Sequence, residues 1–146
     1  MIALACDHGG FRLMQEVKEY LNERGLAYSD FGTDSEKSCD YPTIAYPAAK
    51  AIVDGACEKG IFICGTGIGI SIAANKIRGI RAAVCGDTFS AEMTRAHNDA
   101  NVLAIGARVT GPGLALKIID IFLATEFEGG RHARRVELIS ELEALS

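Results

Sequence analysis

Short apolar runs alternate with longer amphipathic segments along the whole chain, and this alternation restricts the possible folds more than any other feature. The short runs predict strands at residues 2–6, 27–32, 60–65, 80–86 and 101–107. The longer segments predict helices at residues 10–25, 41–54, 69–77, 88–96, 110–125 and 133–145. Strands that alternate with helices form a parallel sheet covered on both faces. We therefore expect an α/β fold in one domain, residues 1–146: a three-layer Rossmann-like sandwich with a five-stranded parallel sheet, from whose core the last helix extends.

Local signals set the ends of some helices. Gly25 is expected to end the first helix, as the residue that follows its C-cap. Pro42 and Pro47 are expected to mark the start of the second helix. Thr110, ahead of Pro112, is expected to cap the fifth.

The composition restricts the partners and the compartment. A formal net charge of −4 disfavours nucleic acid or an anionic membrane as the main partner, because both need a basic protein surface. The five cysteines are odd in number and include no Cys-x-x-Cys pair, which favours reduced thiols in a cytosol. The N-terminus lacks the basic region of a signal peptide, and Lys117 and Asp120 interrupt the most apolar stretch. We expect a cytoplasmic protein without a membrane segment.

Polar residues gather where the predicted strands end. Ligands of open α/β sheets bind outside the carboxyl ends of the strands. The residues that follow strands one, three, four and five are Asp7 and His8, Cys64 with a glycine loop, Gly86 and Asp87, and Arg108. His97 and Asn98 stand shortly before strand five, and we count them with the residues at this edge of the sheet, which we call the carboxyl rim. The carboxyl rim is the candidate site.

The loop "CGTGIG" carries glycines at positions 65, 67 and 69. Such glycines let the backbone turn sharply and point N–H groups outward at a helix N-terminus, which favours an anion. Plain strand-to-helix turns use glycine as well, so a purely structural turn stays open. A nucleotide is disfavoured, because Ile70 and Ile72 stand where the dinucleotide fingerprint requires a third glycine and no P-loop sequence follows.

Cys64 lies at the end of the predicted third strand and precedes these amides directly. Backbone N–H groups at a helix N-terminus favour the thiolate form, and the Thr66 hydroxyl could hydrogen-bond the sulfur. A thiolate there could act as a nucleophile or as a general base. The alternative is a buried thiol beside a structural turn, which is also the expectation for Cys6, Cys57 and Cys85.

The segment "GGRHARRVE" places Arg131, His132, Arg134 and Arg135 at the start of the last helix. Basic charge is unfavourable at a helix N-terminus, so either this is a solvated basic turn or it serves a ligand. Arg131 and Arg135 lie about one helical turn apart and could converge on a phosphate. The three histidines lack a metal-type spacing, so we expect no metal. Together these groups suit proton abstraction next to a carbonyl in a sugar phosphate, through an enediolate.

Six motifs span essentially the whole chain: "CDHGG", "DYP", "ICGTGIGISIAANK", "GIRAAVC", "HNDANVLAIGARV" and "EGGRHARRV". With them the sequence resembles the type B ribose-5-phosphate isomerase family, which is closely allied to the galactose-6-phosphate and allose-6-phosphate isomerases. It implies interconversion of D-ribose 5-phosphate and D-ribulose 5-phosphate without a metal or an organic cofactor.

The resemblance also implies roles for individual residues. Cys64 matches the base, with Thr66 beside it. His97 matches the residue that assists opening of the furanose ring, with Asp7 as its partner. The remaining matches are expected to bind the substrate. The resemblance implies that Tyr41 lines the pocket, that Asn98 contacts the substrate, and that the backbone amides of Gly65, Gly67, Ile68 and Gly69 bind the enediolate. It also implies that four residues bind the phosphate and the rest of the substrate: His8, Arg108, Arg131 and Arg135. The roles of Arg134 and His132 stay open.

Some family members lack the cysteine and carry a glutamate base six positions later. This chain has Ile70 there, which supports Cys64 as the base. The galactose-6-phosphate enzymes resemble a version split over two subunit types, whereas this chain keeps both halves of the site, which favours the ribose-type assignment. We therefore expect a homo-oligomer, most simply a homodimer whose subunits share a pocket. The alternatives are an isomerase of six-carbon aldose phosphates or of free aldoses, and a flavodoxin-like anion-binding module without chemistry, in which Cys64 would be inert.

Overall fold

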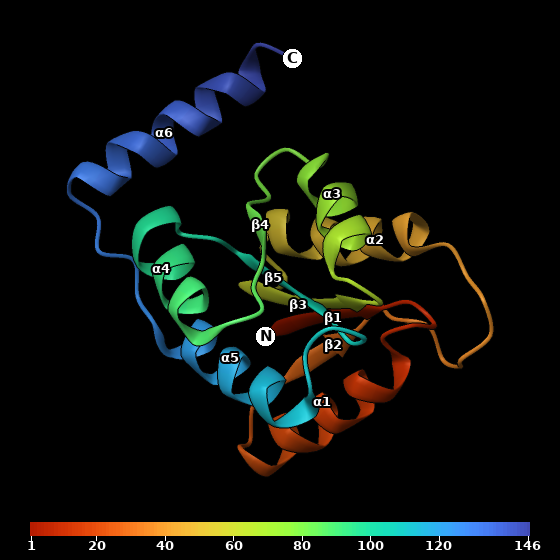
Figure 1. The fold of residues 1–146 in the computed structure, drawn as a ribbon. Coiled ribbons are helices and arrows are strands. Elements are labelled where there is room, and N and C mark those ends of the chain that lie inside the picture. The colour runs from red at the N-terminus through yellow and green to blue at the C-terminus, as the bar shows by residue number, and fades with distance from the viewer.

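The computed structural model describes all 146 residues and contains one sheet of five parallel strands (Figure 1). The strands are β1 (Ile2–Cys6), β2 (Tyr28–Asp30), β3 (Lys59–Cys64), β4 (Ala82–Val84) and β5 (Val102–Gly106). They are ordered β2-β1-β3-β5-β4, so the long strands lie in the centre and the three-residue strands form the edges. The register pairs Cys6 with Ile63 and Cys64 with Gly106, which aligns the carboxyl ends of the central strands. The predicted parallel sheet is confirmed.

Helices cover both faces of this sheet (Figure 1). They are α1 (Phe11–Glu23), α2 (Tyr41–Val53), α3 (Ile68–Asn75), α4 (Thr88–Asn98), α5 (Pro112–Ala124) and α6 (Arg131–Ala144). The first hydrophobic cluster joins α1, α4 and α5 to one face, and the second joins α2 and α3 to the other. The three-layer α/β fold is therefore confirmed.

The alternation of side chains along β3 decides on which face the predicted base lies. Ile61 and Ile63 belong to the cluster under α1 and α5, whereas Phe62 and Cys64 belong to the cluster under α2 and α3. Successive side chains of a strand point to opposite faces, which explains this division. Cys64 thus ends its strand beneath the start of α3.

Several predicted helix ends need correction. Gly25 has a φ of +67° and follows the C-cap of α1, as expected. Thr110 does not cap α5: Pro112 is the first helical residue, so the capping position falls on Gly111, and Thr110 is buried. Pro47 does not mark the start of α2 but lies inside it. The last helix begins at Arg131, two residues earlier than predicted.

Helix α6 extends from the body of the molecule, as predicted (Figure 1). None of its residues is buried. Its C-terminal end is attached where the Gly79 N–H donates to the Glu143 carboxylate at 3.1 Å. Leu138, Ile139 and Leu142 are nonetheless exposed on it. No helix of the structure combines the length and the apolar character that a bilayer crossing requires.

Candidate active site

A pocket of about 430 Å³ lies at the carboxyl ends of β1, β3 and β5. It contains eight of the predicted site residues: Asp7, His8, Tyr41, Cys64, Gly65, Thr66, Gly69 and Arg108. Cys39 and Asp40 line it as well and are not among the residues predicted from the sequence. The position of Asp40 directly before Tyr41 is the one signal that could have identified it. Asp87, also at a strand end, instead caps α4 by accepting the Ser90 N–H at 2.7 Å.

Cys64 is 5% exposed and its sulfur accepts a hydrogen bond from the Gly67 N–H at 3.1 Å. This contact comes from the loop backbone and not from Thr66, whose hydroxyl oxygen accepts the Ile68 N–H at 3.2 Å. The N–H groups of Gly65 and Gly69 donate to no protein atom. A negative charge on the sulfur, or on an oxygen bound beside it, would therefore meet backbone donors at the start of α3.

The other buried thiols lie in a different environment. Burial raises the pKa of Cys6 to about 12, and the neighbouring Asp30 adds to this shift. Burial also raises the pKa of Cys85 to about 11, with a smaller contribution from Asp87. Both cysteines pack in the cluster under α1 and α5, and neither lines the pocket. They behave as small apolar side chains, as predicted.

The loop needs glycine at two positions for different reasons. Gly67 has a φ of +78°, and a Cβ there would lie 2.8 Å from the carbonyl carbon of Ile105. A Cβ on Gly69 would lie 2.6 Å from the Tyr41 ring. The first glycine lets the chain turn against β5, and the second lets Tyr41 approach the loop closely enough to wall the pocket.

We expect Gly67→Ala to lower the free energy of unfolding by about 2–4 kcal/mol, because an L side chain is strained at this φ and would collide with backbone. Urea denaturation measures the change. Gly113→Ala is the matched control, because a Cβ there meets no atom within 4 Å and should change stability by less than about 1 kcal/mol. Equal stability of Gly67→Ala and the control would contradict the steric argument.

Asp7 and His8 form a tight turn after β1. One Asp7 carboxylate oxygen accepts the N–H groups of Gly9 at 2.9 Å and Gly10 at 3.1 Å. The Cys39 N–H donates to His8 Nδ1 at 3.3 Å, so a neutral His8 ring carries its proton on Nε2. Asp7 thus stabilises the turn, and the Nε2–H group of His8 is available to donate a hydrogen bond to a ligand.

Arg108 joins the end of β5 to the glycine loop. Its N–H donates to the Gly65 carbonyl at 3.0 Å, and the Ala107 N–H donates to the Cys64 carbonyl at 2.9 Å. The Arg108 side chain is exposed and forms no ion pair within the chain. Its charge is therefore available to an anion in the pocket.

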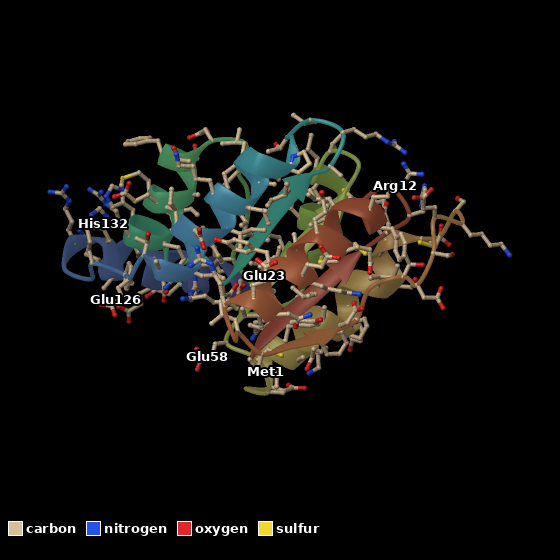
Figure 2. The ribbon with its side chains drawn as sticks, turned by 90° about the horizontal axis from the view of Figure 1, so that it is seen from below. Met1, Arg12, Glu23, Glu58, Glu126 and His132 are labelled. Carbon is tan, nitrogen blue, oxygen red and sulfur yellow. The ribbon has the colours of Figure 1, made fainter.

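Of the six remaining predicted site residues, Gly67 and Ile68 belong to the glycine loop beside Cys64, and the other four lie elsewhere in the chain. His97 and Asn98 end α4 and precede β5, so they are at the amino edge of the sheet, and counting them with the carboxyl rim was wrong for a single chain. Arg131 and Arg135 lie on α6 and are exposed. In Figure 2, His132 at the start of α6 and Arg12 at the start of α1, four residues after His8, lie at opposite ends of the molecule. One chain therefore does not bring these four residues to Cys64.

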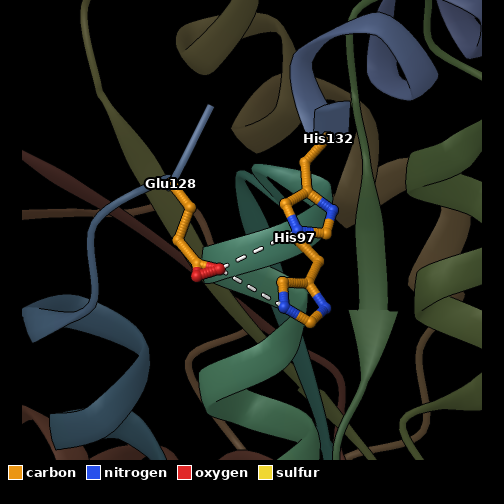
Figure 3. A group of neighbouring side chains, drawn as sticks. All are labelled: His97, Glu128 and His132. Carbon is orange, nitrogen blue, oxygen red and sulfur yellow. Dashed lines mark ion pairs between the residues drawn. The ribbon is translucent and has the colours of Figure 1, made fainter. Parts of the chain in front are cut away.

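His97 instead belongs to a cluster with Glu128 and His132 (Figure 3). The Glu128 carboxylate lies 3.4 Å from His97 Nε2 and 3.8 Å from His132 Nε2. The two rings are stacked, with centroids 4.1 Å apart. Desolvation lowers the pKa of His132, and the nearby His97 and Arg131 add to this shift. Glu128 is not among the residues predicted from the sequence, although its spacing of four from His132 is a signal that the sequence contains.

Comparisons with known proteins find one family model and several similar proteins. Residues 2–139 match the family described as Ribose/Galactose Isomerase. Over 142 residues the chain is 52% identical to ribose-5-phosphate isomerase B of Escherichia coli (strain K12), covering 97% of this chain and 95% of that protein. Over 143 residues it is 47% identical to D-erythrulose-4-phosphate isomerase of Pectobacterium atrosepticum, covering 97% and 94%. Among solved structures, Clostridium thermocellum ribose-5-phosphate isomerase B matches with a TM-score of 0.97 and 53% identity, over 98% of this chain and 97% of that one.

Proposed function

Because the chain belongs to the ribose/galactose isomerase family and is thus an aldose–ketose isomerase, we propose that it interconverts D-ribose 5-phosphate and D-ribulose 5-phosphate with Cys64 as general base. The observation that carries the proposal is the Cys64 sulfur, which lies in the pocket wall against the N–H of Gly67 at 3.1 Å. The resemblance to ribose-5-phosphate isomerase B proteins supports the five-carbon substrate.

The proposed reaction moves one proton between neighbouring carbons of the open-chain sugar. The Cys64 thiolate takes the proton from C2 of the aldose, the electron pair of that bond forms a C1–C2 double bond, and the C1 oxygen takes up the negative charge. The Cys64 thiol then returns its proton to C1 of this cis-enediolate, while the O2 hydroxyl proton passes to O1 and C2 becomes the carbonyl. The unused N–H groups of Gly65 and Gly69 are the proposed donors to the enediolate oxygens.

The pocket also offers groups that suit the rest of the substrate. His8 Nε2 can donate to a sugar or phosphate oxygen, and Arg108 can pair with an anion. Tyr41 limits the width of the pocket through its contact with Gly69. Thr66 fixes the loop through Ile68, which keeps the amides in place. In this proposal Asp7 acts through the turn that it holds, in addition to its expected partnership with His97.

The direct test is formation of ribulose 5-phosphate from ribose 5-phosphate by the purified chain, with a chelator present. We expect turnover in both directions. Parallel assays with allose 6-phosphate, galactose 6-phosphate and free ribose separate the alternatives. The proposal fails if a six-carbon phosphate or a free aldose is turned over with a higher kcat/KM than ribose 5-phosphate.

The second candidate substrate is a sugar phosphate with a different number of carbon atoms. The relative at 47% identity is named for a four-carbon substrate, and its similarity also covers nearly the whole chain. One carbon more or less in a pocket changes discrimination by about 1–3 kcal/mol, which a few lining residues can supply. Including D-erythrulose 4-phosphate in the same assays tests this candidate.

We further propose that two copies of the chain complete each site. His97, Asn98, Arg131 and Arg135 lie away from the Cys64 pocket of their own chain, and a two-fold axis can bring them to the pocket of a second copy. The exposed apolar residues Leu138, Ile139 and Leu142 of α6, and Ile68 and Ile72 of α3, suit such an interface. A cytoplasmic location is part of this proposal and fits five cysteines that are all free thiols.

We expect Arg135→Ala to raise the KM for ribose 5-phosphate about 10–100-fold, with a smaller effect on kcat. The lost interaction is a charge-assisted hydrogen bond to the phosphate, worth about 1.5–3 kcal/mol. Arg134→Ala is the matched control, because Arg134 is also exposed on the same helix; this variant should leave KM within about twofold. A KM that is unchanged in Arg135→Ala would remove this residue from the phosphate site.

A further inference from the structure

The cluster of His97, Glu128 and His132 has the composition of a transition-metal site (Figure 3). It lies outside the Cys64 pocket, at the end of α4 and the start of α6. One ligand atom from each residue, two imidazole nitrogens and one carboxylate oxygen, lies within 4.8 Å of the others. Two histidines and one glutamate are a known zinc set that leaves a fourth position open for water.

The distances are close to those that a bound metal requires. With metal–ligand bonds of about 2.0–2.1 Å, tetrahedral coordination spaces neighbouring ligand atoms about 3.3–3.4 Å apart. The separation of His97 Nε2 from Glu128 Oε1 is 3.4 Å, and that of His132 Nε2 from the same oxygen is 3.8 Å. The rings are 10° from parallel, so one must tilt before both lone pairs converge. The side chain of His97 is 38% exposed, which leaves it free to do so.

The backbone holds the three residues together. The Glu128 N–H donates to the Ala96 carbonyl at 3.0 Å, which ties the loop to the end of α4. Gly129 and Gly130 follow with φ values of +70° and +57° and turn the chain so that His132 stacks on His97. Glu128 forms no ion pair with any lysine or arginine; its charged partners are these two histidines. The carboxylate is thus free to serve a cation.

We propose that His97, Glu128 and His132 bind a divalent transition metal of the Zn²⁺ class. We further propose that the bound ion inhibits the enzyme, because His97 cannot assist opening of the sugar ring while it coordinates the metal. Imidazole ligands favour Zn²⁺, Co²⁺ and Ni²⁺ over Mg²⁺ and Ca²⁺, which prefer oxygen. The second half of the proposal rests on the proposed function, because it assumes that His97 assists catalysis. The first half does not depend on any activity.

Direct titration of the full chain with Co²⁺, followed by its visible absorption, tests the binding. Co²⁺ serves as the probe because thiolate ligation adds a strong near-ultraviolet band that imidazole and carboxylate ligands lack, so binding at Cys64 or Cys39 is recognised. We expect one Co²⁺ per chain without the thiolate band. We expect Glu128→Gln and His132→Gln each to weaken binding at least about tenfold. Glu126→Gln, which removes the same charge from an exposed position of the same loop, should stay within about twofold.

The proposal is overturned if wild type and Glu128→Gln bind Co²⁺ equally, or if the thiolate band appears with the first equivalent. For the second half, Zn²⁺ should inhibit isomerisation of ribose 5-phosphate reversibly, with half-inhibition at least about tenfold higher in Glu128→Gln than in Glu126→Gln. Binding without inhibition would overturn the proposed inhibition through His97. If the chain does not isomerise ribose 5-phosphate at all, the proposed function fails, while the Co²⁺ titration still decides the metal site.

Discussion

We expect Cys64→Ala to lower the kcat for ribose 5-phosphate by at least about 10³-fold while KM changes by less than about fivefold. A positioned general base contributes about 10²–10⁴-fold to rate, and the expected value lies within this range because no other thiol is positioned to replace it. Cys39, which also lines the pocket, has its sulfur 3.9 Å from His8 Nδ1, and no N–H group of the glycine loop donates to it. Substrate binding should survive because the amides, His8 and Arg108 remain.

Coupled spectrophotometric assays of Cys64→Ala and of a control variant measure kcat and KM. Isothermal titration calorimetry measures binding of ribose 5-phosphate to Cys64→Ala. Cys57→Ala is the matched control: Cys57 is 3% exposed and packs in the same hydrophobic cluster as Cys64, but it lies outside the pocket. It should keep kcat within about twofold, since truncating a small buried side chain mainly costs stability. If Cys64→Ala retained wild-type turnover, the thiol would not be the base, although the chain would remain an isomerase.

The sequence predicted the central strands and the residues that follow them. The apolar runs that form β1, β3 and β5 are five or six residues long and almost entirely buried, a pattern typical of a parallel sheet. Once the strands run parallel, the positions after them must share an edge, so Asp7, Cys64 and Arg108 meet in one pocket. The position of the candidate base therefore followed from topology alone.

The rule that ligands bind at the carboxyl ends of the strands does not apply to His97 within one chain. A residue that precedes a parallel strand lies at the amino edge, about one strand length from the residues that follow it, and His97 precedes β5. The role of His97 is implied by the resemblance alone, which does not say in which chain of an oligomer the residue acts. Sequence periodicity carries no information on whether a distant residue reaches a site in its own chain or in a second copy.

Side-chain contacts were less predictable than backbone placement. The expected bond from Thr66 to the sulfur depends on the loop conformation, and in the structure the Gly67 N–H donates to the sulfur instead. The approach of His97 to His132 depends on two glycines with positive φ between α6 and the preceding loop. These contacts arise from local backbone angles, which neither composition nor hydrophobic period records.

Mixing two inactive variants should restore activity if the sites are shared. We expect Cys64→Ala and His97→Ala to be inactive alone, and an equal mixture that has exchanged subunits to recover about a quarter of wild-type activity. Random pairing makes half of the dimers mixed. In each mixed dimer, the His97→Ala subunit supplies an intact Cys64 pocket and the Cys64→Ala subunit supplies an intact His97, so one of two sites is complete.

A site contained within one chain predicts a different result, because every pocket of the mixture would then lack either its base or its histidine and no activity would return. A mixture of Cys64→Ala with Cys64→Ser is the control, since no pairing of these two restores a complete site. Ultracentrifugation of the same samples reports whether dimers form at all. Recovery near a quarter of wild-type activity would assign His97 to the pocket of the second copy. Recovery near zero in dimers that have exchanged subunits would contradict shared sites. His97 could then act only if a rearrangement moved the end of α4 to the carboxyl edge of its own sheet.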